Sequence, residues 1–405
     1  MSFNILLYGA TGFSGRLIAA RASSQMAAKP YGSCRMILAG RNGAELRKVA
    51  ADTKMPFRTF SLDNPVAVDR ALDGVDLVLN AAGPFAFTAL PLARAALRAG
   101  CHYVDINGEL DVYRALDDFA EKAYRLGIAM VCGAAASAGA SDVLLDIVLK
   151  ELGTKGTLAA DAELGAVRIA MVQTPDFSRG SAAAALLLLR EQVLVVRKGV
   201  ADDGRGGQRQ QMVFWHEPVG KLERTFRFRA GPRDQGRPGD AKGGPRIASA
   251  ANLIDTPTAR RTVDRNGRVA HAIESYVETG PYGRIAYQVG GMLSPLLALP
   301  GAKQWIRMQT SLLPEGPRPE ELRTNHACVL EIEDVHRKLL AQLRLVTPNV
   351  YVLTAQIAVE VACEVARSKD PAIRGWVTPA QALGLTADTF LASSAFEGCS
   401  VQMVA

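Results

Sequence analysis

The sequence predicts an α/β protein whose first domain is a doubly wound parallel sheet. The first observation is that a short apolar strand, residues 3–8, runs directly into a glycine-rich turn and then into a helical pattern. The second is that strand and helix patterns alternate as far as residue 132, which gives six strands separated by helices. Alternation of this kind produces parallel strands joined by right-handed crossovers, with helices on both faces of the sheet.

Each predicted element follows from its local pattern. One helix begins with Pro65, which the first helical turn tolerates because the missing N–H needs no partner there. The predicted strands are Phe3–Tyr8, Arg35–Ala39, Phe57–Leu62, Val75–Asn80, His102–Asp105 and Ile128–Cys132. The helices between them are predicted at Arg16–Ala28, Ala44–Ala51, Pro65–Leu72, Leu90–Ala99 and Leu110–Leu126.

The turn after the first strand has the spacing of a phosphate cradle. Gly9 allows a tight turn, Gly12 lets the backbone approach a pyrophosphate, and Gly15 lets the helix pack closely on the strand. The helix N-terminus then faces the anion, as in a Rossmann-type dinucleotide site. The predicted cofactor-binding residues of this turn are Gly9, Thr11, Gly12, Phe13, Ser14 and Gly15.

The residue that ends the second strand predicts which cofactor binds, because ligands of such sheets lie beyond the carboxyl ends of the strands. Arg41 stands where an NAD-binding protein usually has an acidic residue for the ribose diol. Its guanidinium fits a 2′-phosphate, so the sequence predicts NADP(H), with Asn42 also at the cofactor. Asp63, after the third strand, either accepts a hydrogen bond from the adenine amino group or caps the helix that begins at Pro65.

Two further strand ends supply candidates for the nicotinamide half of the site. Tyr103, Asp105 and Glu109, around the end of the fifth strand, are candidate catalytic residues for proton handling or substrate orientation. The alternative is structural, with Asp105 and Glu109 holding the turn and capping the next helix. The small residues after the fourth strand let the backbone approach the nicotinamide ribose, and the predicted cofactor residues there are Asn80, Ala81, Ala82 and Gly83.

Composition argues against several other kinds of site. The six cysteines contain no CxxC pair and the five histidines no HExxH pattern, so we predict reduced thiols and no metal site. The net charge of +7 is concentrated in residues 197–246, where 12 Lys and Arg face 6 Asp and Glu. This segment is rich in Gly and Pro and has no aromatic interleaving, which favours a solvated loop and excludes a nucleic-acid site. A first strand without a charged leader predicts a cytoplasmic protein.

The motifs YGATGFSG, AGRN, NAAGPF and AGCHYVDINGE together resemble the saccharopine dehydrogenase-like family, especially its trans-acting enoyl reductase branch. The turn after the sixth strand departs from the family pattern in being alanine-rich, and Arg179 stands where the family commonly has glycine. Segments 132–134, 141–142, 178–182, 316–323 and 377–384 fit the later family pattern. The resemblance implies a nucleotide domain at 1–140, an inserted α/β domain of mixed sheet for substrate and dimerisation at 141–345, and a returning C-terminal segment at 346–405.

Hydrophobic patterns in the second half agree with an inserted domain. Strands are predicted at Ala162–Gln173, Leu222–Phe228, Cys328–Ile332 and Arg337–Val346, and helices at Ser181–Leu194 and Thr354–Arg367, the last docking on the first sheet. Residues 285–302 carry no charge but contain glycines and prolines, which argues against a membrane span. They are interpreted as a buried helix pair or as an apolar lip that touches lipid or an acyl chain.

Three functions fit these residues. The first is NADPH-dependent reduction of a carbon–carbon double bond in an acyl substrate, free or carrier-bound, in a homodimer with a peripheral membrane contact as an open alternative. The second is oxidation or reduction of a C–N bond, as in saccharopine-type enzymes. The third is a non-catalytic NADP-binding protein on lipid or in a complex. Short-chain dehydrogenase chemistry is excluded because none of the nine tyrosines has Lys four residues later.

Overall fold

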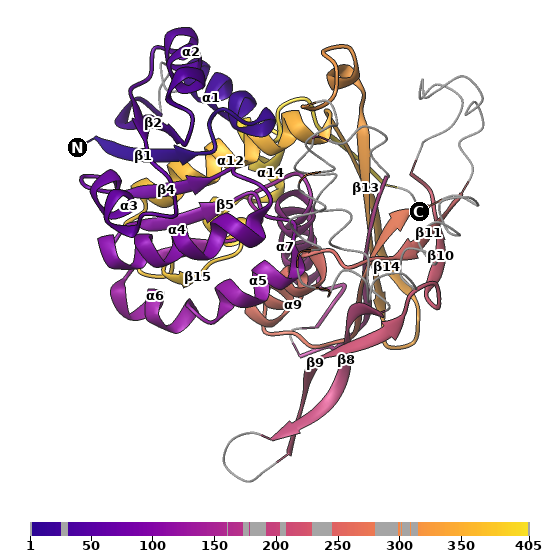
Figure 1. The fold of residues 1–405 in the computed structure, drawn as a ribbon. Coiled ribbons are helices and arrows are strands. Elements are labelled where there is room, and N and C mark those ends of the chain that lie inside the picture. Colours follow the sequence, from indigo (N-terminus) through magenta and orange to yellow (C-terminus); the bar gives the residue numbers. More distant parts are fainter. Residues whose placement is uncertain are drawn as a thin grey trace.

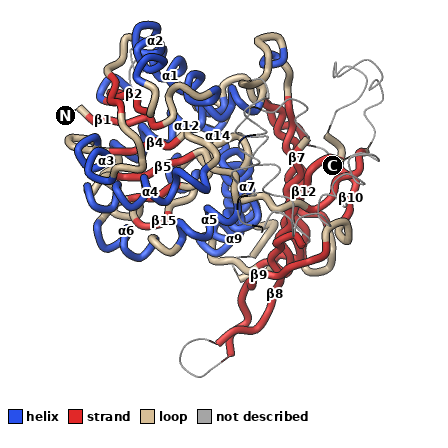
Figure 2. Tube along the Cα trace, in the orientation of Figure 1, coloured by secondary structure: helices blue, strands red, loops and turns tan. Residues whose placement is uncertain are grey.

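The computed structural model describes residues 2–25, 31–159, 161–172, 178, 192–202, 208–228, 245–279, 299, 301, 308 and 315–403. In these residues the chain forms two β-sheets with helices between them (Figure 1, Figure 2). The first sheet is parallel and the second is mixed, so the predicted α/β class with two different sheets is confirmed.

The first sheet contains the six predicted strands in the order β6-β5-β4-β1-β2-β3, which is the order of a doubly wound dinucleotide-binding fold. A short seventh strand, β15, pairs in parallel with β6 and comes from the C-terminal part of the chain. The strands are β1 Phe3–Tyr8, β2 Cys34–Gly40, β3 Phe57–Thr59, β4 Leu77–Asn80, β5 His102–Asp105, β6 Ala129–Val131 and β15 Gly375–Trp376.

The helices of the first domain differ from the prediction in two places. α4 begins at Phe85, five residues before the expected start, and contains Pro91 in its interior. The single helix predicted over residues 110–126 is two helices, because the N–H of Phe119 bonds to the carbonyl of Leu116 and tightens the turn between them. The helices are α1 Phe13–Gln25, α2 Gly43–Thr53, α3 Pro65–Ala71, α4 Phe85–Ala99, α5 Leu110–Asp117 and α6 Ala120–Leu126.

Both faces of the first sheet are buried, as the strands of a parallel sheet require. In β1, Ile5 and Leu7 point into a core shared with α1, α2, α7 (Ala138–Thr154) and α12 (Val350–Arg367). Leu6 and Tyr8 point the other way, into a core shared with α3, α4, α5 and α6. The first core continues through α7 and α9 (Asp255–Arg265) into the second sheet, so α7 lies between the two sheets.

The second sheet has the strand order β10-β11-β12-β7-β13-β14-β16. β7 and β12 are parallel and the other neighbouring strands are antiparallel. β8 pairs with β12 over two residues and then continues with β9 as a long hairpin that extends away from the body (Figure 1). The strands are β7 Leu164–Met171, β8 Gln192–Asp202, β9 Gln208–Pro218, β10 Glu223–Phe226, β11 Arg246–Ala250, β12 Ala270–Glu278, β13 His326–Asp334, β14 Leu339–Thr347 and β16 Ser400–Met403.

The strands predicted in the second half are present as β7, β10, β13 and β14, whereas the helix predicted at 181–194 is wrong at its end because residues 192–194 open β8. Residues 181–191, and 285–302 except for Leu299 and Gly301, lie outside the described residues. α12 packs against α1, β1, β4 and β5, as predicted for a helix docking on the first sheet. β16 instead joins the second sheet, and the domain boundaries at 140 and 345 stay predictions.

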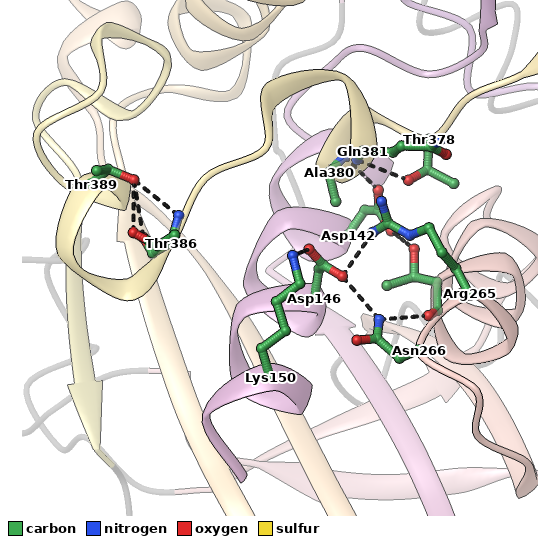
Figure 3. Close-up of polar contacts among 11 residues, drawn as sticks. Asp142, Asp146, Lys150, Arg265, Asn266, Thr378, Ala380, Gln381, Thr386 and Thr389 are labelled. Atoms are coloured by element: carbon green, nitrogen blue, oxygen red, sulfur yellow. Dashed lines mark hydrogen bonds and ion pairs between the residues drawn. The ribbon is translucent and has the colours of Figure 1, made fainter. Parts of the chain in front are cut away.

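Polar contacts fasten α7 to α9 and to the short helix α13 (Pro379–Leu383), which precedes α14 (Ala387–Phe390) (Figure 3). The carboxylate of Asp142 accepts from the hydroxyl of Thr262 and, at 2.8 Å, from the N–H of Ala380. The carboxylate of Asp146, one turn later, pairs with Arg265 at 2.7 Å. These bonds fix α7 against α9 and α13, which follow it by more than 100 positions in the chain.

Candidate functional site

The strand ends of the first sheet bring the predicted cofactor residues together. Because the strands are parallel, Tyr8 lies opposite Ala39 in β2 and opposite Asn80 in β4, and Asn80 lies opposite Asp105 in β5. The turns that follow β1 to β6 therefore open at one edge of the sheet, which we call the carboxyl edge. Ligands of doubly wound sheets bind at such an edge.

The three glycines of the first turn have three different environments. Gly9 has a φ of +89°, which glycine adopts freely, and a Cβ there would lie 2.7 Å from the backbone nitrogen of Ala82. A Cβ on Gly15 would lie 2.0 Å from the carbonyl oxygen of Gly9, so α1 packs directly on the turn. Among the described residues, a Cβ on Gly12 would meet only that same oxygen, at 3.4 Å. The turn is therefore open at Gly12, and a dinucleotide phosphate fits it.

The other predicted residues of this turn line the start of α1. The ring of Phe13 packs edge-on against Tyr351 in the first turn of α12, with ring centroids 5.1 Å apart. The carbonyl of Thr11 accepts a hydrogen bond of 2.6 Å from the guanidinium of Arg16. Ser14 is half-buried in the first helical turn. The cradle is thus held from below by the helix that returns from the C-terminal part of the chain.

Arg41 is exposed at the end of β2, and its guanidinium makes no hydrogen bond or ion pair within the described part of the chain. Burial raises the pKa of Tyr8, and the nearby charges of Arg41 and Asp63 act on it in opposite directions, so both charges lie near the end of β1. Asn42 caps α2, since its side chain accepts from the N–H of Ala44 at 3.1 Å. The exposed position of Arg41 directly after β2 leaves its guanidinium available to an anionic ligand at the carboxyl edge.

Asp63 does not cap the helix that follows it. Its carboxylate accepts from the hydroxyl of Ser61 at 2.8 Å, and the side chain of Asn64 caps α3 by accepting from the N–H of Ala67 at 3.1 Å. The capping alternative for Asp63 is therefore wrong, because the residue next to it is better placed at the N-cap. The contact with adenine stays a prediction.

The turn after β4 is held by the side chain of Asn80. Asn80 is fully buried, its amide oxygen accepts from the N–H of Ala82 at 3.0 Å, and its amide nitrogen donates to Thr88 at 3.2 Å. Ala81 is buried behind this turn, whereas Gly83 is exposed. Asn80 thus shapes the turn from below, and its neighbours supply the surface that faces outward.

Tyr103 and Asp105 form a buried pair beneath the carboxyl edge. Tyr103 is 1% exposed, and its hydroxyl donates to Asp105 at 2.9 Å while accepting from Asn80 at 3.3 Å. The other oxygen of Asp105 accepts from the N–H of Asn107 and of Gly133, each at 3.0 Å. Burial raises the pKa of Asp105 to about 6, although its hydrogen bonds oppose the shift. The pair joins the turns after β4, β5 and β6, and both side chains are buried beneath these turns.

Glu109 caps α4, a helix that precedes it in the chain. Its two carboxylate oxygens accept from the N–H of Phe85 at 2.7 Å and of Ala86 at 3.0 Å. Pro84 occupies the N-cap position and has no side-chain acceptor, so the neighbouring turn provides one. The predicted cap at Glu109 therefore acts on a different helix from the one expected.

The start of α12 is a part of the site region that sequence reasoning missed. The hydroxyl of Tyr351 accepts from the N–H of Ser178 at 2.7 Å, while its ring contacts Phe13. A Cβ on Gly316 would lie 2.4 Å from that same Phe13 ring. Three segments far apart in sequence thus meet beside the cradle, and only the amphipathic pattern of α12 signalled this.

The described residues contain neither a candidate metal cluster nor a helix suited to cross a membrane. No group of three or more His, Cys, Asp or Glu side chains is placed there to hold a metal ion. No helix in that same part of the chain is long and apolar enough to cross a membrane.

The parallel sheet, the glycine cradle and the carboxyl edge define a dinucleotide-binding domain of the Rossmann type. Residues 5–138 match the model of the saccharopine dehydrogenase NADP binding domain. The resemblance predicted from the motifs of the first domain is therefore confirmed over these residues.

Three curated relatives are similar to a part of the chain. The chain is 35% identical over 141 residues to the trans-acting enoyl reductase of Mycobacterium tuberculosis and 34% identical over 139 residues to that of Mycobacterium leprae. It is 28% identical over 142 residues to the saccharopine dehydrogenase-like oxidoreductase of Rattus norvegicus. Each match covers 32% of this chain and about a third of the relative.

Two solved structures share the fold over the whole chain. Apo saccharopine dehydrogenase (L-Glu forming) from Saccharomyces cerevisiae has a TM-score of 0.60 at 11% identity, covering 100% of both chains. Homospermidine synthase from Legionella pneumophila, in complex with NAD, has a TM-score of 0.59 at 10% identity, covering 100% of this chain and 91% of the other. At such identities the likeness concerns the fold alone.

Proposed function

We propose that this protein is an NADP-dependent oxidoreductase that reduces a carbon–carbon double bond of an acyl substrate. The observation that carries the proposal is the 35% identity over 141 residues to trans-acting enoyl reductases. The open cradle at Gly12 and the exposed Arg41 support NADP as the cofactor. When bound, NADPH supplies a hydride for the β-carbon of the enoyl group.

The residues of the carboxyl edge hold the cofactor and keep the turns in place. The N–H groups at the start of α1 would hold the pyrophosphate, and Arg41 would pair with the 2′-phosphate. We assign Tyr103, Asp105 and Glu109 a positioning role, because their polar atoms bind the turns after β4, β5 and β6. Their loss would then act on the shape of the nicotinamide pocket.

A carrier-bound acyl chain is the form of substrate that we favour, and we expect the protein to act as a homodimer. The relatives are trans-acting enoyl reductases, and the word trans-acting fits an enzyme that receives its substrate from another protein. The test of this form is a comparison between an acyl carrier protein loaded with crotonate and the crotonyl thioester of pantetheine.

The experiment for the reaction itself measures NADPH oxidation by the purified protein with crotonyl pantetheine. A matched reaction contains saccharopine and NADP⁺, which reports the C–N chemistry. Reduction of the thioester together with no turnover of saccharopine supports the proposal. Turnover of saccharopine alone would replace it with the C–N function, and tight NADPH binding without turnover of either would leave a cofactor-binding protein.

A further inference from the structure

A buried aspartate meets a half-buried serine where α7 begins. Ser137 immediately precedes α7, and its hydroxyl donates to Oδ2 of Asp255 in the first turn of α9, at 2.6 Å. Ser141, one turn further along α7, donates to Oδ1 of Asp255, also at 2.6 Å. Asp255 and Ser141 are each 1% exposed, whereas Ser137 is half-buried. Only one of the two serines therefore reaches toward the surface.

Ser137 lies at the carboxyl edge, on the nicotinamide side of the sheet. The turn that leads from β6 to Ser137 is tied to Asp105 by the N–H of Gly133, at 3.0 Å. It is tied to α12 by the N–H of Ala136, which donates to the hydroxyl of Thr354 at 3.1 Å. The first turns of α12 also contact the cradle through Tyr351. These bonds place the serine between the end of β6 and the second domain.

The hydroxyl of Ser137 does not do what a serine at the start of a helix usually does. A serine at the N-cap normally accepts a hydrogen bond from an N–H of the first turn. The side chain of Ser137 makes no such bond and turns to Asp255 instead. Asp255 therefore orients this hydroxyl, in the way that a carboxyl group orients a proton-transferring partner.

Asp255 is buried without a cation to offset its charge in the described part of the chain. The groups that face it there are the two serine hydroxyls of α7 and the thiol of Cys328 in β13. Burial raises the pKa of Asp255, so its carboxyl keeps a proton to higher pH than an exposed aspartate does.

We propose that Ser137 and Asp255 form the proton donor of the reductase, an inference that rests on the proposed function. The hydroxyl of Ser137 is the group that touches the substrate. Asp255 acts through it, as a positioning residue that also replaces the transferred proton. Tyr103 is a candidate for proton handling from the sequence, but its hydroxyl donates to the buried Asp105. We therefore assign the role of proton donor to Ser137.

The step balances without a further reactant. Addition of hydride to the β-carbon leaves the electrons of the double bond as an enolate. The O–H bond of Ser137 breaks, its proton forms the new C–H bond at the α-carbon, and the proton of the Asp255 carboxyl moves to the serine oxygen. The Asp255 carboxylate then takes a proton from water. In the structure the Ser137 hydroxyl donates to Asp255 at 2.6 Å. In the proposed step the protonated carboxyl of Asp255 donates to the Ser137 oxygen instead, which frees the Ser137 proton for the substrate.

The test compares Ser137→Ala and Asp255→Asn with the matched control Ser141→Ala, which removes an equal hydrogen bond to Asp255 from a buried position. Infrared difference spectra of the NADPH complex at neutral pH should show a protonated carboxyl band that Asp255→Asn removes. With crotonyl pantetheine, Ser137→Ala and Asp255→Asn should lower kcat by about 100-fold or more, because general acids contribute at least that much. Ser141→Ala should stay within about tenfold, Ser137→Thr should restore part of the rate, and NADPH affinity should be unchanged throughout.

Each outcome decides one claim. Absence of the carboxyl band, or equal losses in Ser137→Ala and Ser141→Ala, would overturn the proton donor and leave a structural contact. The band together with the expected split in kcat supports it. A protein that shows the band but oxidises no NADPH with any enoyl thioester contradicts the proposed reductase function, a result distinct from loss of the donor pair.

Discussion

Arg41 is the residue that determines cofactor choice in the proposed function. Its guanidinium is exposed at the end of β2 and has no partner within the described residues. We expect NADPH to bind more tightly than NADH, and Arg41→Ala to remove most of the difference, since a hydrogen-bonded charge pair contributes roughly 1.5 to 3 kcal/mol. Fluorescence titrations with both cofactors measure this. Arg47→Ala, which removes an exposed arginine from the middle of α2, is the control and should keep the preference. Equal affinities in the unmodified protein would refute the prediction.

Gly12 and Gly15 should respond differently to the same substitution. At Gly12 a Cβ meets only one protein oxygen, at 3.4 Å, in the described part of the chain, so Gly12→Val should abolish cofactor binding while the fold survives. At Gly15 the added atom would lie 2.0 Å from the carbonyl of Gly9, so Gly15→Val should lower the melting temperature as well. Calorimetric titration and thermal unfolding separate the two effects. Undiminished binding by Gly12→Val would show that the turn is only structural.

Glu109 shows which properties of a single residue can be predicted from the sequence and which cannot. The sequence singled it out as a carboxylate near the nicotinamide, but its partners, Phe85 and Ala86, precede it by more than 20 positions and only the folded chain brings them together. Glu109→Ala should lower the free energy of unfolding by about 1.5 to 3 kcal/mol, because two buried N–H groups lose a charged acceptor. Urea denaturation tests this, with the exposed Glu121→Ala as control. Loss of turnover without loss of stability would instead assign Glu109 to the chemistry.

At the scale of elements, the local hydrophobic pattern predicts the positions of the strands well and the ends of the helices less well. The six strands of the first sheet were predicted because parallel strands are continuous apolar runs. The start of α4 was missed because its cap comes from Glu109 in another turn, and residues 192–194 were assigned to a helix because a buried strand and an apolar helix share the same composition. Such choices depend on partners that the local sequence does not contain.

The contacts of α7 predict how stability changes with pH. Burial raises the pKa of Asp142 to about 6 from an ordinary value of 3.8. Because the folded state holds this proton more tightly than the unfolded chain, the contribution to stability is full below about pH 4 and is lost as pH rises through about 6. Between those limits the free energy of unfolding of Asp142→Asn should gain about 2 to 3 kcal/mol relative to the unmodified protein. Denaturant unfolding across this pH range measures it, and a constant difference would contradict the predicted sign.

At the scale of the whole molecule, the count of charges along residues 197–246 overestimates the free positive charge of the basic segment. Of its positive groups, Arg197 pairs with Glu274 at 2.8 Å and Arg224 pairs with Glu333 at 2.8 Å. Both glutamates lie outside residues 197–246, in strands that only the folded sheet brings near. Part of the excess charge is therefore neutralised inside the second sheet, which the linear sequence could not reveal.

The remaining charge leads to the last prediction, on delivery of a carrier-bound substrate. Arg227 is exposed, and Arg229 and Arg233, two further arginines of the basic segment, lie outside the described residues. Changing all three to Glu should raise the KM for crotonate loaded on an acyl carrier protein, which is acidic, and spare crotonyl pantetheine. The effect should weaken as salt rises, because charges steer a partner over about 8 Å at physiological ionic strength. If both substrates respond alike, or neither responds, these arginines take no part in recognising the carrier, and delivery by a carrier protein loses its support from the residues.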